Sequence, residues 1–257
     1  LDAAATLVQT EVKAGQTPAQ LSIRAGGDLV TTQINAAGQA GKAVGDMKLT
    51  LAPFEPVPLR ALALKGRNIN PGFFNPALPA ADLSIAVMAQ IDPKKAISGT
   101  VDIANDGKVG PIDKQLLPLL AMRGRLGGNL NAMQIDDVLL DMGAAGKFTG
   151  GGAVLRGPQD KGIGSARFKL HTDRINLKSL YSTMKATAIA GDIQLTSAGD
   201  VQTLGAQLSE RGMRLDAEAT LAKQVLDIKR ARLTAGSGHV DVAGSASLED
   251  KRAFKLG

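Results

Sequence analysis

Apolar and polar side chains alternate with a period of two residues in many segments of this chain. Residues 213–221 show the pattern best, because every odd position is apolar and every even position is polar. In a β-strand, this spacing places all the apolar side chains on one face. The alternation, with Gly or short polar clusters between the segments, predicts strands over residues 5–10, 20–25, 28–36, 43–51, 58–65, 82–91, 96–104, 119–127, 130–142, 146–156, 164–172, 190–197, 201–209, 212–222, 224–234 and 238–248.

Two short helices interrupt this series of expected strands. Asn70 is suited to cap a helix in which Pro71 takes the first position, and Asn176 is suited to cap a helix over residues 176–184. A third helical turn is expected over residues 113–117, before Pro118. Nearly all the rest of the chain is expected to form turns.

The two helix starts belong to an internal repeat. Each is preceded by a strand that ends in an Arg and followed by an Ala-rich strand start, and Ile175 follows Ile69 by 106 residues (175 − 69). We therefore expect repeat units over about 58–165 and 166–257, within one continuous β-rich piece, 1–257, of a longer rod. Stacked β units of this kind contact only their neighbours, which favours an elongated structure over a closed globule.

Composition limits what the apolar faces can bind. Aromatic residues make up 3% of the chain, with no Trp and one Tyr, so stacking surfaces for sugars or bases are almost absent. The net charge of +6 comes from Lys and Arg residues that are mostly isolated at the polar positions of strands, which indicates solvated faces and no nucleic-acid partner. The chain contains no Cys, which excludes disulfides and thiol chemistry.

The chemical motifs in the sequence are incomplete. Residues 102–113 resemble the start of a calcium loop, but Ala104 and Asp113 occupy positions that need other ligands. Gly41-Lys42 lacks the hydroxyl residue of a phosphate-binding loop, and the Ser182–Lys185 spacing of penicillin-binding enzymes has no partner motif. The sequence therefore predicts no catalytic residues, no metal site and no cofactor, and we expect that the protein is not an enzyme.

A resemblance to a known family rests on residues 62–74 (L-A-L-K-G-R-N-I-N-P-G-F-F) and 78–83 (L-P-A-A-D-L). Further matching residues lie at 103–105, 110–113, 117–119 and 122–124. In this order they resemble the TamB family of AsmA-like envelope proteins of Gram-negative bacteria. The resemblance covers about residues 58–156 well, and the remainder by pattern only.

The resemblance implies an all-β fold, namely an elongated, open and curved sheet, or β-taco, with an apolar groove. It also implies a periplasmic location with an inner-membrane anchor helix outside this piece, and the outer-membrane barrel TamA as a partner. The implied function is bridge-like transport of phospholipid between the inner and outer membranes, in support of outer-membrane lipid homeostasis and protein assembly. The acyl chains would contact the apolar strand faces through Leu83, Ile85, Val87, Ile91, Ile97, Val101, Ile103, Leu120, Met122, Leu126, Phe148, Val154, Phe168, Leu170, Ile193, Leu195, Met213, Leu215, Leu221, Val240 and Val242.

Two other interpretations of the alternation remain open. A β-solenoid surface protein or adhesin would bury the same apolar faces in a closed, dry core. A β-helix carbohydrate enzyme is a third possibility, and the low aromatic content argues against it.

Overall fold

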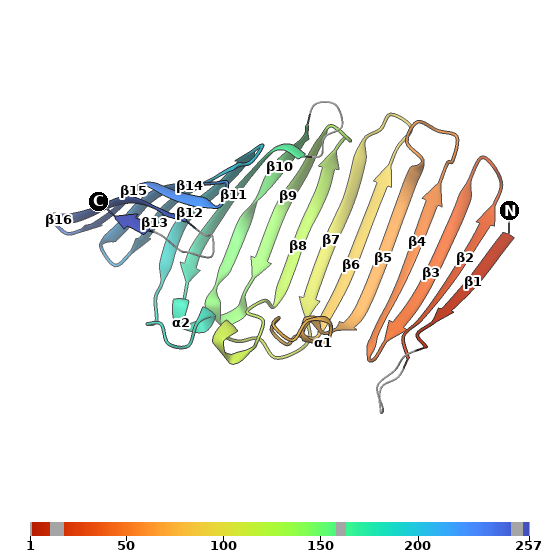
Figure 1. Cartoon of the computed structure of the whole chain (residues 1–257), viewed down its shortest axis with the longest axis horizontal. Helices are drawn as coiled ribbons and strands as arrows, with labels where there is room; N and C mark the ends of the chain where they lie inside the picture. Colours follow the sequence, from red (N-terminus) through yellow and green to blue (C-terminus); the bar gives the residue numbers. More distant parts are fainter. Residues whose placement is uncertain (1, 11–17, 158–162, 248–253, 257) are drawn as a thin grey trace. The chain divides into compact units, whose positions relative to one another are not determined.

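The computed structural model of the protein describes residues 2–10, 18–157, 163–247 and 254–256. The chain divides into two compact units. Unit 1 comprises Leu1–Leu130 with Asp141–Gly143, and unit 2 comprises Asn131–Leu140 with Ala144–Gly257. Strands make up most of both units (Figure 1).

Unit 1 is an antiparallel meander in which each strand pairs with the next one along the chain (Figure 1). A two-residue turn of Gly41 and Lys42 joins the third and fourth strands, and the positive φ of 60° at Gly41 suits such a tight hairpin. The strands are β1 (Asp2–Val8), β2 (Gln20–Gly27), β3 (Thr32–Ala40), β4 (Ala43–Leu51), β5 (Leu59–Ile69), β6 (Leu83–Ile91), β7 (Ile97–Asn105) and β8 (Ala121–Gly128).

Unit 2 continues the same principle of sequential antiparallel pairing, from β10 to the last strand, with β9 paired to β10. A bulge at Lys229 and Arg230 interrupts the ladder between β15 and β16. The strands are β9 (Ala132–Asp141), β10 (Lys147–Arg156), β11 (Ile163–Ile175), β12 (Ile189–Ala198), β13 (Val201–Glu210), β14 (Met213–Ala222), β15 (Val225–Ala235), β16 (Gly238–Ser247) and β17 (Phe254–Leu256).

One short α-helix lies in each unit, and both are capped in the same way. In α1 (Pro71–Phe74), the Asn70 side chain accepts hydrogen bonds from the backbone N–H groups of Gly72 (3.0 Å) and Ala81 (3.4 Å). In α2 (Leu177–Leu180), Asn176 accepts the corresponding bonds from Lys178 (3.2 Å) and Thr187 (3.3 Å). The donors are 2 and 11 residues after the Asn in both cases, so the two copies of this element share one local structure at the 106-residue spacing.

Both predicted caps are therefore confirmed, but the second helix is shorter than the predicted 176–184. It ends at Leu180, where the backbone of Tyr181 becomes extended. The third expected turn is a 3₁₀-helix, η1 (Ile112–Lys114), and a second 3₁₀-helix, η2 (Gly143–Ala145), follows β9. None of the helices among the described residues has the length and apolar character that a membrane crossing requires.

The predicted strand over residues 28–36 begins too early. Asp28 accepts hydrogen bonds from the backbone N–H groups of Val30 (2.9 Å) and Thr31 (2.7 Å), which forms a tight turn. The bonds from Thr31 and Val30 also hold the pKa of the Asp28 carboxyl below its usual range. Leu29 and Val30 consequently lie in a loop, with 72% and 76% of their surface exposed, and β3 starts at Thr32.

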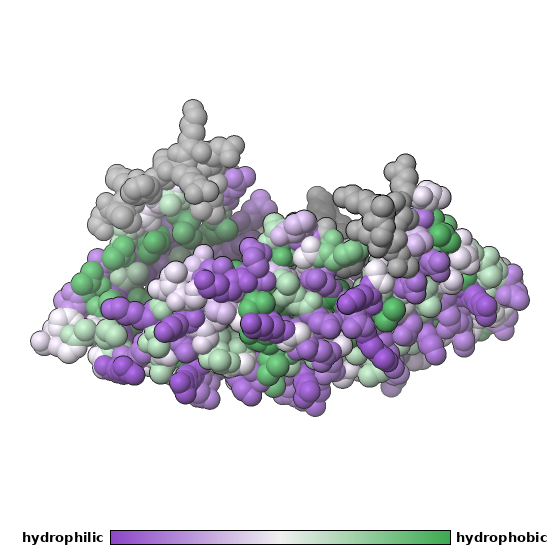
Figure 2. Space-filling view, turned by 90° about the horizontal axis from the view of Figure 1, so that it is seen from below, coloured by the Kyte–Doolittle hydropathy of each residue, from purple (hydrophilic) through white to green (hydrophobic). Residues whose placement is uncertain are grey.

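The sheet of each unit is open. No described register pairs β1 with β8 in unit 1, and none pairs β9 or β10 with β17 in unit 2. The predicted fold class is thus confirmed: the protein is all-β, with open antiparallel sheets that extend strand by strand and two short helices. Hydrophilic side chains cover much of the surface that Figure 2 shows, with smaller hydrophobic groups between them.

Candidate functional site

The apolar face of unit 1 is a set of straight rows that cross all eight strands. The antiparallel registers align one residue from each strand, and the alternation keeps each row on one face. The middle row is Ala5, Ile23, Ala36, Met47, Leu64, Val87, Val101 and Gly124. The row on one side is Leu7, Leu21, Gly38, Gly45, Gly66, Ile85, Ile103 and Met122, and the row on the other side is Ala3, Ala25, Ile34, Leu49, Leu62, Ala89, Gly99 and Leu126.

These three rows contain no charged and no hydrogen-bonding side chain at any of their described positions. Apart from Arg60, at a bulge near the start of β5, the charged residues of the same strands lie at the alternate positions, on the opposite face. Lys65, for example, pairs in register with Asp46, and Asp102 pairs with Arg123, which it also contacts at 3.4 Å. Segregation of charge in unit 1 is therefore a direct product of register and alternation.

Most predicted lining residues of unit 1 share this face. Ile85, Val87, Val101, Ile103, Met122 and Leu126 belong to the three rows. Leu83, Ile91 and Ile97 extend the same face toward the ends of β6 and β7. Leu120 lies just before β8, and its carbonyl oxygen accepts a hydrogen bond from the backbone N–H of Asn105, which continues the β7–β8 register toward the position two residues before Met122.

Unit 2 has an apolar face built in the same way. Phe168 and Leu195 lie in one row with Gly152, Leu204, Ala219, Ile228 and Gly244. Leu170, Ile193 and Val242 lie in the next row, with Gly150, Ala206, Ala217 and Ala231.

The other predicted lining residues of unit 2 lie on this face as well. Leu215 and Val240 belong to a third row, and Val154 and Leu221 to a fourth, which also contains Ser197 and Gln202. Phe148 and Met213 lie two residues before Gly150 and Leu215 in their strands, and so on the same face. The structure thus brings all the predicted residues of unit 2 to one face.

Neither apolar face is covered by another layer of the described chain. Buried apolar side chains are limited, among the described residues, to Ala52, Ile91, Ile97, Ala145 and Ile175. Members of the rows remain accessible: Leu64 is 38% exposed, Leu195 44% and Leu204 46%. Large apolar residues are normally among the most buried in a protein, so these faces are unusual for a dry core.

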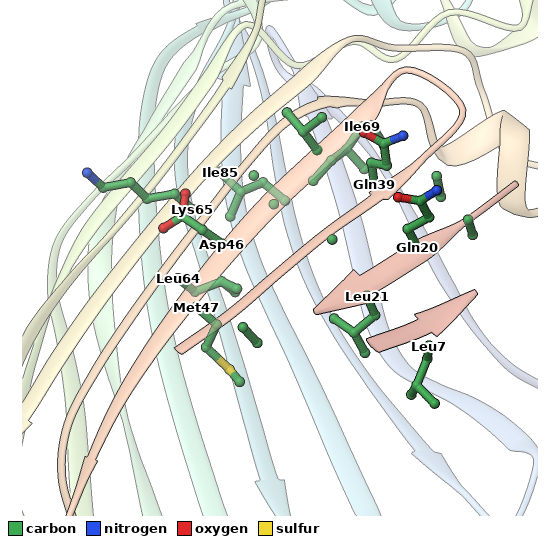
Figure 3. A pocket seen from close by; sticks show the side chains of 18 of the residues that line it. Leu7, Gln20, Leu21, Gln39, Asp46, Met47, Leu64, Lys65, Ile69 and Ile85 are labelled. Atoms are coloured by element: carbon green, nitrogen blue, oxygen red, sulfur yellow. The ribbon is translucent and has the colours of Figure 1, made fainter. Parts of the chain in front are cut away.

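A cavity of about 740 Å³ indents the apolar face of unit 1. Residues of β1 to β6 line it, and Figure 3 shows Met47 and Leu64 next to each other on its wall. Its floor contains three glycines in direct register, Gly38 on β3, Gly45 on β4 and Gly66 on β5. Since a glycine has no side chain, the three positions together leave a trough across the strands.

The trough is filled at one end and open in the middle. A Cβ atom at Gly66 would lie 2.7 Å from Cδ1 of Ile69, so the Ile69 side chain occupies the space above Gly66. A Cβ atom at Gly45 would meet only backbone atoms, at 3.3 Å from the Lys65 carbonyl oxygen and 4.0 Å from the Gly66 Cα. In unit 2 the Phe168 ring closes over Gly152, where a Cβ atom would lie 2.2 Å from the ring.

The opposite faces carry the charges, several of them paired across strands. Arg232 donates two hydrogen bonds to Asp241, at 2.6 and 2.8 Å, which raises the pKa of the arginine and lowers that of the carboxyl. His171 contacts Asp192 at 2.9 Å and Asp173 at 3.2 Å. Hydrogen bonds to these two carboxylates, Asp192 first, raise the pKa of the imidazole. Both clusters are half-exposed, as expected for a solvated face.

A polar cleft of about 570 Å³ on the charged face of unit 2 was not predicted from the sequence. Its lining includes Lys169, Gln194, Thr203, Gln207 and Glu218, around Gly205. Most of these side chains are exposed and both signs of charge are present, which is typical of a hydrated sheet surface. No group of three or more His, Asp or Glu residues in the described part of the chain is arranged to hold a metal ion.

Two buried polar side chains, also missed by the sequence reasoning, have structural partners. Asn105 is 4% exposed, accepts hydrogen bonds from the backbone N–H groups of Asp82 and Gly107, and donates one to the Leu119 carbonyl. Thr172, 1% exposed, donates to the Lys147 carbonyl at 2.7 Å. Both residues fix strand ends, which explains their burial without a ligand.

The fold and its apolar faces define a class of protein, an open antiparallel β-sheet protein with uncovered apolar surfaces. Comparison with known proteins identifies no relative: no family model, curated protein or solved structure matches this chain.

Proposed function

We propose that this protein binds phospholipid acyl chains on its apolar sheet faces and forms part of a bridge-like lipid-transport protein of the TamB type. In this proposal it works in the periplasm between the inner and outer membranes, with TamA as a partner of the full-length protein. The observation that carries the proposal is the apolar face of unit 1, which has no charged side chain in three rows across eight described strands.

The size of this face supports the proposal. Eight strands of about 4.8 Å width each and three rows of about 6.6 Å width each give a footprint of roughly 38 by 20 Å, or about 760 Å². The largest apolar patch on a typical monomer is about 300–600 Å², and larger patches mark sites of interaction with proteins, membranes or ligands. The sparse aromatic content fits aliphatic occupants better than sugars or bases.

An open face also suits transport, because it binds each lipid weakly. If about ten methylene groups of a chain lose half of their water contact, the gain is about 4 kcal/mol at 0.8 kcal/mol per fully buried methylene. Such a free energy corresponds to a dissociation constant of about 1 mM. A lipid held at this strength exchanges rapidly between neighbouring positions, whereas a closed pocket would retain it.

The alternative function, a closed-core solenoid surface protein, needs a second wall over each apolar face. The exposed Leu64, Leu195 and Leu204 side chains favour the lipid-binding proposal over this alternative.

Bound lipid tests the proposal directly. We would purify the protein without detergent, expose it to phosphatidylcholine vesicles that contain a phospholipid with a diazirine in its acyl chain, and map photolabelled peptides by mass spectrometry. We expect labels on the apolar rows of β4 to β7. The absence of acyl-chain labelling from every apolar row would refute the proposal.

A further inference from the structure

The trough over Gly38, Gly45 and Gly66 lies within the cavity of about 740 Å³ on the apolar face of unit 1, and it runs across the strands. The three glycines are register partners on β3, β4 and β5, with Leu21 and Ile85 at the next positions on β2 and β6. From β2 to β5 the row spans three strand spacings, about 14 Å. It therefore offers a straight path at right angles to the strands.

The trough has side walls as well as a floor. Met47 and Leu64, in the middle row, line one side, and Ala40, Ala43 and Ile69 line the other. These walls are four residues apart along the strands, about 13 Å between backbone positions. Their side chains narrow the remaining space, so an α-helix, with a diameter of about 10–12 Å, is too wide for it.

The chemistry of the trough selects one occupant. A bound peptide strand needs partners for its backbone N–H and C=O groups, and burial of such a group without a partner costs free energy. The rows that form the floor and the middle-row wall carry no charge and no hydrogen-bonding side chain. The cavity is also lined by Gln9, Gln20 and Gln39 and by Asp46 and Lys65, which are register partners of opposite charge (Figure 3). Charge complementarity therefore favours an uncharged chain without hydrogen-bonding groups, which is a hydrocarbon.

We propose that the trough is a subsite for a single lipid acyl chain, which lies over Gly38 and Gly45 across strands β2 to β5 and ends against the Ile69 side chain above Gly66. This inference rests on the proposed lipid-binding function and adds the place and the direction of the chain. Gly45 is the open point of the path, and the Ile69 side chain over Gly66 closes the path beyond it.

Gly45→Val tests the subsite because the fold should accept the change. The nearest atoms to a Cβ at Gly45 are at 3.3 and 4.0 Å, and its φ lies outside the left-handed region. Valine is also favoured over glycine in strands. The Lys65 carbonyl must shift by a few tenths of an ångström, so we expect a melting temperature close to that of the wild type, together with a side chain that blocks the trough.

The matched control is Gly205→Val, on β13 in unit 2. This position also lies within a strand, and the atom nearest to its Cβ is the Gln194 carbonyl oxygen at 3.9 Å. It belongs to the polar face, because its register partners are Gln194 and Glu218. The control thus repeats the chemical change away from the apolar row.

The readout is photolabelling of the whole protein by two phosphatidylcholine probes, with the diazirine near the ester or near the methyl end of the acyl chain. We expect labels on β2 to β5 of the wild type, with the two probes favouring different strands. We also expect at least a tenfold loss of these labels in Gly45→Val and full labelling in Gly205→Val. Gly45→Ala adds one methyl group and should give an intermediate loss of labels. It replaces Gly45→Val as the test of the subsite if the Val variant has a lowered melting temperature.

The possible failures are distinct. Labels on the apolar rows that are equally strong in Gly45→Val or Gly45→Ala and in the wild type would overturn the subsite and leave the proposed function in place. Probes that favour different rows along one strand would overturn the direction of the chain. A wild type without acyl-chain labels on either apolar face would remove the proposed function itself.

Discussion

A carboxylate on β7 distinguishes an open apolar face from a covered one. Val101 and Ile97 lie on the same face of this strand, opposite Val87 and Ile91 on β6. Val101 is half-buried, whereas Ile97 is 8% exposed. Val101→Asp therefore places a carboxylate where water can reach it. Ile97→Asp places the same group on the same strand and face, but where water cannot reach it.

The expected losses of stability differ in size. Full burial of a Val side chain contributes about 1.5–3 kcal/mol, so Val101→Asp should cost about 1–2 kcal/mol for a half-buried residue whose carboxylate keeps its water. Ile97→Asp loses a buried side chain and also leaves a buried carboxyl without a partner, which costs several kcal/mol in total. Val87→Asp, opposite Val101, should behave like Val101→Asp.

Chemical denaturation followed by far-ultraviolet circular dichroism measures both losses, because the chain has no Trp for fluorescence. Acyl-chain photolabelling of the same variants should fall around Val101 while the fold is retained, since the carboxylate interrupts the hydrocarbon surface. A loss of several kcal/mol for Val101→Asp, equal to that for Ile97→Asp, would show that the face is covered and would refute the open groove.

Three further predictions concern the caps, the charged face and a strained glycine. Asn70→Ala and Asn176→Ala each remove two hydrogen bonds at a helix start and should each lower the free energy of unfolding by about 1 kcal/mol; equal stability of wild type and variants in urea would contradict the shared cap. Because the pKa of His171 is raised in the folded state, its ion pairs should stabilise the protein below the unfolded-state pKa of about 6.5, and this stabilisation should disappear as the pH rises through the raised value. His171→Gln should abolish that part of the pH dependence of unfolding, and an unchanged profile would rule out the assignment. Gly191→Ala should destabilise by more than about 1 kcal/mol, because φ is +144° and the new Cβ would lie 2.0 Å from the Gln207 carbonyl oxygen, whereas Gly205→Ala should be nearly neutral in the same denaturation assay.

The alternation in the sequence predicts most strands well, because the period of two residues in a half-buried strand can be recognised from neighbouring residues alone. In β14, each odd position from Met213 to Leu221 is apolar, and the structure places these residues on one face. The errors occur where a side chain competes with the ladder for backbone hydrogen bonds. Asp28 captures the N–H groups of Val30 and Thr31 and delays β3, although Leu29 and Val30 read as strand residues.

The alignment of the three glycines in the trough depends on strand register, which the alternation alone does not determine. Gly38 and Gly45 are equidistant from the two-residue turn of Gly41 and Lys42, so recognition of this tight hairpin would have aligned them. Read as a motif, Gly41-Lys42 resembles an incomplete phosphate-binding loop, which does not indicate this alignment. Gly66 lies beyond residues 52–58, a longer connection that does not fix a register, so the third glycine could be aligned only by the structure.

The sequential pairing of the strands explains how the protein keeps its apolar faces without a second layer. Each strand of unit 1 bonds to its chain neighbours through a full backbone ladder, and the strand ends are held by the caps and by buried groups such as Asn105. Since stability in such an array is a sum of nearest-neighbour terms, the face itself contributes only part of it. Residues in the middle row, such as Val87 and Val101, therefore contribute less to folding than residues of a closed core, and they remain accessible to a hydrocarbon ligand. Changes at these positions should accordingly affect lipid binding more than folding, whereas changes at Ile91 and Ile97 should do the reverse.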